Sequence, residues 1–123
     1  MLINLSNHPC QNWSAEQKAV ATSQFGEIID LSFPQIPPDW DTDKICKLVN
    51  EYFHICEQLW EDEKSSCTVH LVGEPVFCFI LAQLLLKANI CCVSATTERI
   101  VVEENGIKVS EFHFKRFREY MLL

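Results

Sequence analysis

Two short polar segments hold the side chains that are best suited to chemistry on a phosphorylated ligand. The first, Ser6–His8, follows the apolar run at residues 2–5, and the second, Ser94–Arg99, follows the apolar run at residues 90–93. An imidazole can exchange a proton near neutral pH, while hydroxyl, amide and guanidinium groups donate hydrogen bonds to phosphate oxygens. Short apolar runs are typical of buried strands, and the carboxyl ends of parallel strands form the crevice in which ligands bind. The two segments are therefore predicted to line one binding site.

The predicted site divides into residues that would act on the ligand and residues that would hold it. His8, as a general acid or base, and Arg99, as a stabiliser of phosphate charge, are the predicted catalytic residues. The predicted ligand-binding residues are Ser6, Asn7, Gly73, Glu74, Thr96 and Thr97. Gly73 and Glu74 join this set because they follow a third predicted strand, so that three loops could converge on one crevice.

Each of these side chains also has a purely structural interpretation. Asn7 and His8 could satisfy backbone groups of the turn, and Arg99 could pair with a glutamate on the same surface. Glu74 is better placed to cap the helix that follows it than to bind a ligand. His70 alternates with apolar neighbours in a predicted strand, so we expect it to pack rather than to act in catalysis.

Apolar periodicity and capping signals locate the elements that would position these segments. Strands are predicted at residues 2–5, 27–31, 68–72 and 90–93, and helices are predicted to begin at Ser14, Thr42 and Pro75. Alternation of strands and helices produces an open parallel sheet with helices on both faces. Asn105-Gly106 lies between two further strand-like segments and is a strong signal for a two-residue hairpin turn.

We therefore predict the α/β class, with a single Rossmann-like domain over residues 1–123. It would contain about four parallel strands with helices on both faces in a core over residues 1–97, and a C-terminal β-hairpin with a tail over residues 98–123. The helix after Pro75 is apolar on nearly every side, which indicates central burial or a subunit interface. A homodimer is therefore expected.

Composition and net charge argue against several classes of function. Hydrophobic residues make up 48% of the 123 residues and charged residues 22%, which is typical of a globular protein rather than a disordered one. The net charge of −7 argues against broad binding to long nucleic acid, although Lys115, Arg116 and Arg118 form a local basic patch. With 3 glycines the chain has no glycine-rich phosphate loop, and it shows no spacing typical of zinc ligands. No cofactor and no metal are therefore expected.

The cysteines and the apolar segments of the sequence indicate the cellular compartment in which the protein is expected. The 7 cysteines are odd in number and form no Cys-x-x-Cys pair, which favours reduced thiols packed in a cytosolic core. The start of the chain lacks the pattern of a secretory signal, and the apolar run over residues 76–86 is too short to span a bilayer. We therefore expect a cytoplasmic protein with no membrane partner.

Taken together, six short segments resemble those of a family of short, stand-alone CRISPR-associated proteins with a Rossmann-like fold, related to the CARF (CRISPR-associated Rossmann fold) domains. The segments are Leu2–Pro9, Trp13–Ser14, Ile29–Pro34, Gly73–Glu74, Ala95–Arg99 and Phe117–Tyr120. They are spread over nearly the whole chain. The resemblance implies binding of a cyclic oligoadenylate, the second messenger of type III CRISPR immunity, in a crevice across a two-fold dimer axis.

The resemblance also implies a reaction. Some members of this group are ring nucleases, which without a metal ion align a ribose 2′-hydroxyl with the adjacent phosphorus and leave a 2′,3′-cyclic phosphate. On this chain, Ser6–His8 would touch phosphate or ribose, while Thr96, Thr97 and Arg99 would complete the cradle. Larger CARF proteins carry a fused effector domain that this sequence does not contain, so we expect it to bind or degrade the messenger.

Whether the chain cleaves the messenger stays open, because only His8 is an evident base. Two alternatives also stay open. One is a non-catalytic interaction or regulatory module of a CRISPR system that acts through its apolar helix or its hairpin. The other is a Rossmann-like domain for a different nucleotide.

Overall fold

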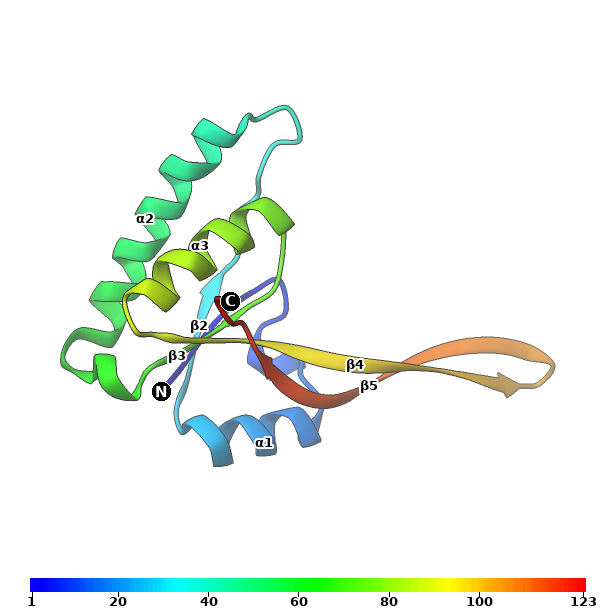
Figure 1. Ribbon diagram of the computed structural model, residues 1–123. Coiled ribbons are helices and arrows are strands. Elements are labelled where there is room, and N and C mark those ends of the chain that lie inside the picture. Colours follow the sequence, from blue (N-terminus) through cyan, green and yellow to red (C-terminus); the bar gives the residue numbers. More distant parts are fainter.

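A five-stranded β-sheet forms the centre of the computed structural model, which describes residues 1–123 (Figure 1). Its strands are β1 (Leu2–Ser6), β2 (Ile28–Ser32), β3 (Thr68–Leu71), β4 (Cys91–Glu104) and β5 (Ile107–Glu119). They lie in the order β2-β1-β3-β4-β5, in which the first four are parallel and β5 runs antiparallel to β4. The predicted α/β fold is confirmed, in the form of a mixed sheet.

Helices cover both faces of this sheet. α1 (Ala15–Phe25) lies on one face, whereas α2 (Thr42–Trp60) and α3 (Pro75–Lys87) lie on the other, as Figure 1 shows. Two short 3₁₀ helices, η1 (Cys10–Asn12) and η2 (Glu61–Ser66), join these elements to the strands. Right-handed crossovers between successive parallel strands produce this arrangement. None of the helices has the length and apolar character that crossing a lipid bilayer requires.

Side-chain caps fix where the helices begin. Ser14 Oγ accepts a hydrogen bond from Gln17 N at 3.1 Å, as the capping-box spacing predicts. The predicted cap of α2 is wrong by one residue, because Asp41 rather than Thr42 is the N-cap and its Oδ1 accepts a hydrogen bond from Lys44 N at 3.0 Å. A carboxylate at this position also interacts favourably with the positive end of the helix dipole.

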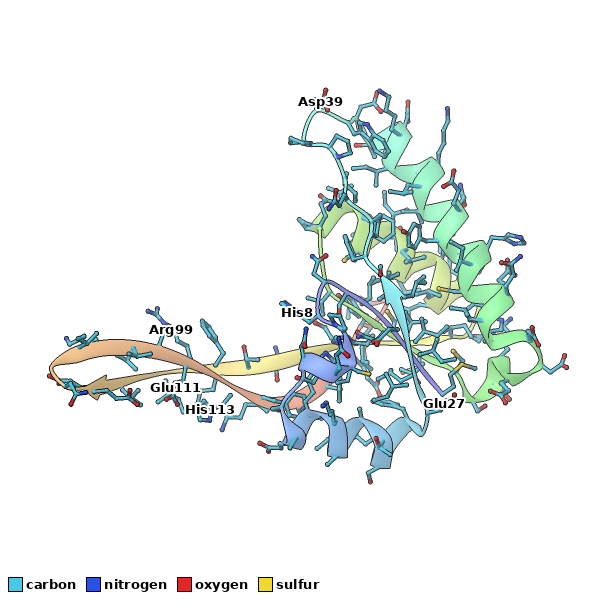
Figure 2. All side chains as sticks on the ribbon, turned by 180° about the vertical axis from the view of Figure 1, so that it is seen from behind. His8, Glu27, Asp39, Arg99, Glu111 and His113 are labelled. Carbon is cyan, nitrogen blue, oxygen red and sulfur yellow. The ribbon has the colours of Figure 1, made fainter.

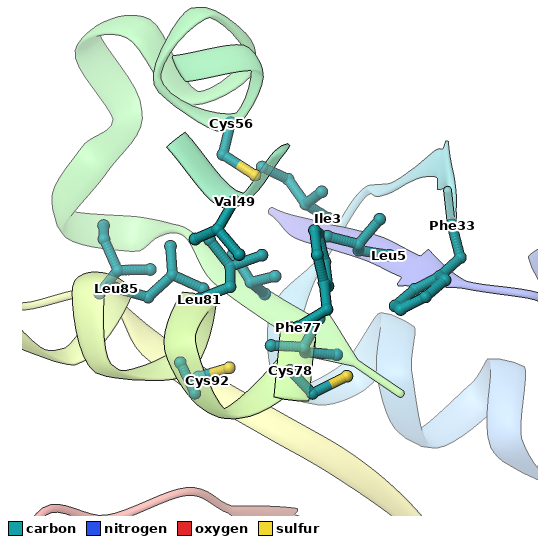
Figure 3. Packing of buried hydrophobic residues seen from close by; sticks show 14 of the residues in the cluster. Ile3, Leu5, Phe33, Val49, Cys56, Phe77, Cys78, Leu81, Leu85 and Cys92 are labelled. Atoms are coloured by element: carbon teal, nitrogen blue, oxygen red, sulfur yellow. The ribbon is translucent and has the colours of Figure 1, made fainter. Parts of the chain in front are cut away.

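The larger of two apolar cores fills the space between the sheet and the pair α2 and α3 (Figure 3). Phe77, Leu81 and Leu85 of α3 are fully buried there, in the same cluster as Ile3 and Leu5 of β1. α3 is therefore a core helix, which is one of the two roles that its apolar sequence predicts.

Gly73 has a packing role beside this core. A Cβ atom at this position would overlap the ring of Phe33. That ring in turn packs edge-on against Phe77, with 5.1 Å between the ring centroids. Glycine is required here because an aromatic ring occupies the space that a side chain would take.

The predicted end of the fourth strand is wrong. The sequence predicts an end at Val93, but β4 continues to Glu104, so Ser94–Arg99 is strand rather than loop. β5 pairs with β4 along this segment and supplies the ladder hydrogen bonds that a free strand end would lack. A bulge interrupts the pairing between Thr96 and Thr97. The boundary predicted between residues 97 and 98 therefore falls inside one continuous strand.

β4 and β5 form a long hairpin that leaves the body of the molecule (Figures 1 and 2). Its turn is Asn105-Gly106, with φ angles of 52° and 80°, which confirms the predicted two-residue turn. We call the part of the hairpin from the Thr97–Phe114 pair to the turn the arm. Figure 1 shows that no helix covers the outer part of the arm.

We predict that Gly73→Ala lowers the free energy of unfolding by about 1–3 kcal/mol, because the new methyl group must displace the Phe33 ring. Urea denaturation measures the change. In a Phe33→Leu background the smaller side chain leaves room, so the same substitution should cost less. An equal cost in both backgrounds would contradict the packing role of Gly73.

Candidate functional site

A hollow of about 420 Å³ opens at the carboxyl ends of β1 and β3, between the N-terminal end of α1 and the base of the arm. Its polar lining residues are Ser6, His8, Asn12, Ser14, Gln17, His70 and Thr97. Its apolar lining residues are Trp13, Val72, Ala95, Phe112 and Phe114. Ligands of open parallel sheets bind at this edge of the sheet. The hollow is therefore the candidate functional site.

The floor of the hollow rests on the side-chain amide of Asn4, which is 1% exposed. Its Nδ2 donates hydrogen bonds to Asp30 Oδ1 at 2.8 Å and to the backbone oxygen of His8 at 2.9 Å. Its Oδ1 accepts from Ser6 Oγ at 2.9 Å and lies 2.8 Å from His70 Nδ1. Both amide protons and both oxygen lone pairs are thus used, which removes the penalty for burying this polar group.

The sheet register brings these groups together. Asn4 stands opposite Asp30 of β2 and opposite His70 of β3. Residues directly opposite one another point to the same face, so the three side chains form a polar row across three neighbouring strands. Asp30 continues the row into the loop after β1, because its Oδ1 also accepts a hydrogen bond from Cys10 N at 3.1 Å.

The imidazole of His70 has one defined tautomer. The backbone N–H of Ala95 donates to Nε2 at 3.2 Å, so Nε2 is unprotonated and Nδ1 donates its proton to Asn4 Oδ1. Burial lowers the pKa of His70 to about 4, and repulsion from His8 acts in the same direction. His70 is therefore neutral at neutral pH. It packs as expected, with its ring 5.3 Å from that of Trp13, and it also joins β1, β3 and β4.

The backbone of His8 is fixed although its side chain is exposed. Its carbonyl oxygen accepts hydrogen bonds from Asn4 Nδ2 and from Trp13 Nε1 at 2.9 Å, and it lies 3.2 Å from Ser6 Oγ. Its N–H donates to Ser6 Oγ at 3.2 Å. The imidazole itself has no partner in the chain and lines the hollow. Figure 2 shows His8 close to the place where the hairpin leaves the sheet. The backbone of His8 is therefore fixed, while its imidazole is free to form hydrogen bonds in the hollow.

The structure brings together only some of the predicted site residues. Ser6, His8 and Thr97 line the hollow, while Asn7 is exposed in the same loop without lining it. Thr96 does not line it, because successive strand side chains point to opposite faces, and its Oγ1 instead donates to the backbone oxygen of Arg116 at 3.2 Å.

Arg99 lies further along the arm, outside the lining of the hollow (Figure 2). Its Nε and Nη2 donate to Ser110 Oγ at 3.1 and 2.9 Å, rather than to a neighbouring glutamate. Cross-strand from it stands Phe112, which does line the hollow. The guanidinium is therefore near the site but bound elsewhere.

The residues after β3 have structural roles. Glu74 caps α3, because its Oε1 accepts from Val76 N at 3.1 Å and its Oε2 accepts from Phe77 N at 2.7 Å. This confirms the capping role favoured by the sequence. Gly73 lies under the Phe33 ring. Neither Gly73 nor Glu74 lines the hollow. From this part of the chain, His70 of β3 and Val72 just after β3 line it instead.

Phe112 and Phe114 form a wall of the site that sequence reasoning missed, next to Trp13. Phe112 and Phe114 come from β5, far along the chain from the loop that holds His8. Trp13 comes from the turn before α1, and its position next to Ser14, the helix cap, is a sequence signal that it lies near the same edge. Trp13 and Phe114 are buried in the smaller apolar core, so Phe112, which is 67% exposed, is the ring of this wall on which a flat base could stack.

The basic patch near the C-terminus is only partly paired. Lys115 Nζ lies 2.8 Å from Glu98 Oε2, whereas Arg116 and Arg118 are exposed and form no ion pair. No group of three or more histidine, cysteine, aspartate or glutamate side chains has the arrangement of a metal site. All 7 cysteines are free thiols, of which Cys91 is exposed.

We predict that Asn4→Ala lowers the free energy of unfolding by about 3 kcal/mol, because it leaves several buried hydrogen-bonding groups without a partner. The matched control is Asn7→Ala, in which an exposed amide is lost and the change should stay within about 0.5 kcal/mol. Chemical denaturation measures both variants. Equal stabilities of the two would disprove the central place of Asn4.

We predict that acid destabilises the protein through His70. The pKa of His70 is about 4 in the folded chain and 6.5 when the side chain is not buried. Between pH 4 and pH 6.5 the unfolded chain therefore binds more protons than the folded chain. The contribution of neutral His70 to the free energy of unfolding is fully present above pH 6.5. It is lost as the pH falls, by about 2 kcal/mol between pH 7 and pH 5. His70→Gln should flatten this slope, and the exposed His54→Gln should not. An NMR titration of His70 near pH 6.5 would overturn the assignment.

Comparison with known proteins identifies a family to which the chain is similar. No curated protein and no solved structure gives a significant match to the chain. The model of a family described as "Uncharacterized protein MJ1673 family" matches residues 1–118. This match spans every residue of the hollow and of the arm. The chain therefore belongs to the MJ1673 family.

Proposed function

We propose that the chain binds a cyclic oligoadenylate, with one adenosine phosphate unit of the ring in the hollow. The observation that carries this proposal is the combination of a fixed, unpartnered imidazole with an aromatic wall at the carboxyl edge of the sheet. His8 offers a donor to phosphate, and Phe112, which is 67% exposed, offers a ring face to adenine. The choice of a cyclic oligoadenylate over another nucleotide comes from the sequence resemblance to the CARF group.

The size of the hollow supports a site shared by two copies. Pockets that enclose a whole drug-sized ligand measure about 300–1,000 Å³. A hollow of about 420 Å³ is at the small end of that range, so it holds part of a ring of several nucleotides. The remainder of the ring would need a second protomer, as in a crevice across a two-fold axis.

Cleavage of the ring is a further step of the same proposal. A ribose 2′-oxygen would attack the adjacent phosphorus and lose its proton to His8, while the bond from phosphorus to the 5′-oxygen breaks and that oxygen takes a proton from water. The products are a 2′,3′-cyclic phosphate and a 5′-hydroxyl. His8 is the single available acid–base group of the lining, because both ring nitrogens of His70 are engaged. Arg99 is held by Ser110, so binding is better supported than turnover.

We predict that Thr97→Val weakens the binding of cyclic tetra- or hexa-adenylate several-fold, because it removes a hydroxyl from the hollow without changing its size. The matched control is Thr96→Val, which alters the next residue on the other face and should bind as tightly as the wild type. Isothermal titration calorimetry measures the affinities. The site is wrong if neither ring binds, or if both variants bind like the wild type.

Turnover is tested with the same two rings, first with a chelator and then with manganese. Chromatography separates the ring from a linear product with a 2′,3′-cyclic phosphate. His8→Ala should stop any such product while it leaves the fold intact, because the side chain has no partner in the chain. Binding without product would make the protein a sensor or a sponge for the messenger.

A non-catalytic interaction module is the second candidate, and the arm favours it. The arm projects from the body and exposes apolar side chains, whereas much of the apolar surface of α3 is used in the core. A protein that regulates a CRISPR complex would use such a projection. Failure to bind any cyclic oligoadenylate would favour this candidate.

A further inference from the structure

The pairing of β5 with β4 is regular except at one residue. Thr96 and Thr97 are adjacent in β4, but their partners in β5, Arg116 and Phe114, are two residues apart. Lys115 lies between these partners and faces no residue of β4, so it is the extra residue of a β-bulge. A bulge bends its strand and increases the local twist, and beside a site it re-aims a side chain.

The bulge lies where the arm begins, at the edge of the hollow. β3 pairs with β4 only as far as Val93, so at Thr97 the single neighbour of β4 is β5. Thr97 and Phe114, the first pair of the arm, line the hollow, and so does Phe112 two residues further from the bulge. The direction that the arm takes at the bulge therefore decides whether Phe112 reaches the hollow.

Buried aromatic side chains hold β5 on both sides of the bulge. Phe114 and Phe117 are both buried in the smaller apolar core, and their ring centroids lie 5.1 Å apart. Residues three apart in a regular strand point to opposite faces, so these two rings share a face only because Lys115 is bulged out. The bulge is therefore held at this position and does not shift along the strand.

Phe112 has no such support. Its ring is largely exposed and makes none of the aromatic contacts that hold Phe114 and Phe117. Its cross-strand neighbour Arg99 is held by Ser110 rather than by the ring. The backbone of the arm, and not the packing of side chains, therefore sets the place of this ring.

We propose that Lys115 is a positioning residue, which as the extra residue of the bulge aims the arm so that Phe112 lines the hollow. The role belongs to the added backbone unit rather than to the ammonium group, which lies 2.8 Å from Glu98 Oε2 and outside the hollow. An exposed ion pair of this kind contributes little to stability. The stacking of a base on Phe112 rests on the proposed function, whereas the direction of the arm does not depend on any ligand.

Deletion of Lys115 tests the direction of the arm. In the shortened strand Phe114 and Phe117 become two residues apart and stay on one face, so the fold should survive. The matched control is Lys115→Ala, which removes the ion pair but keeps the bulge. Residual dipolar couplings of backbone amides measure the orientation of the arm relative to the sheet. The wild type and the control should share one orientation, and the deletion variant should differ from both.

Two outcomes of this measurement would overturn the proposal. One is a deletion variant whose arm keeps the wild-type orientation. The other is a control whose arm turns as far as that of the deletion variant, because the ion pair with Glu98 would then direct the arm.

A binding measurement separates the aiming of Phe112 from a general structural effect. With adenosine 5′-monophosphate as the probe, the deletion should weaken binding about tenfold, because one base loses its stacking partner, and Phe112→Ala should weaken it as much. In the Phe112→Ala background the deletion should have no further effect, because the bulge acts through this ring alone. Additive losses would contradict the proposal.

The two experiments also separate this inference from the proposed function. A wild type that binds neither the monophosphate nor a cyclic oligoadenylate would reject the proposed function. The couplings, which need no ligand, would still decide whether the bulge aims the arm at the hollow.

Discussion

The buried amide of Asn4 is the interaction on which the candidate site depends. Its four hydrogen bonds reach Asp30 of β2, His70 of β3, Ser6 at the end of β1 and the loop at His8. A fully satisfied buried network of this kind costs little to bury, but it tolerates only one arrangement of its members. A slip of one residue in either neighbouring strand would turn the partner side chain to the other face of the sheet. The network therefore specifies the register as well as the position of the loop.

The parallel core follows from local signals in the sequence, but the polar row does not. Apolar runs, caps and the Asn-Gly turn are each contained within a few residues, and the structure has strands, helices and turn near those places. Asn4, Asp30 and His70 are each the third residue of their strand. A polar residue at the third position of three strands is a signal in the sequence. It predicts that the three side chains are neighbours only when the strand order and the register are known.

The long β4 shows why the rest of the site was not predictable. Residues after Val93 are polar enough for a loop, and they become strand because β5, which comes later in the chain, pairs with them. This non-local pairing divides Thr96 and Thr97 between opposite faces and carries Arg99 away from the loop of His8. The same pairing delivers Phe112 to the hollow. Thr96 and Arg99, which are close to Thr97 in the sequence, thus lie outside the hollow, whereas the distant Phe112 lines it.

His70 also marks the last point at which the sheet holds β4 from both sides. β3 pairs with β4 only as far as His70–Val93, and the imidazole then accepts from Ala95 N–H, so a side chain extends the ladder by one step. Beyond that step β5 alone holds β4. One wall of the hollow is therefore anchored in the sheet, while Thr97 and Phe112 belong to the arm. The angle at which the arm leaves the sheet sets the width of the hollow.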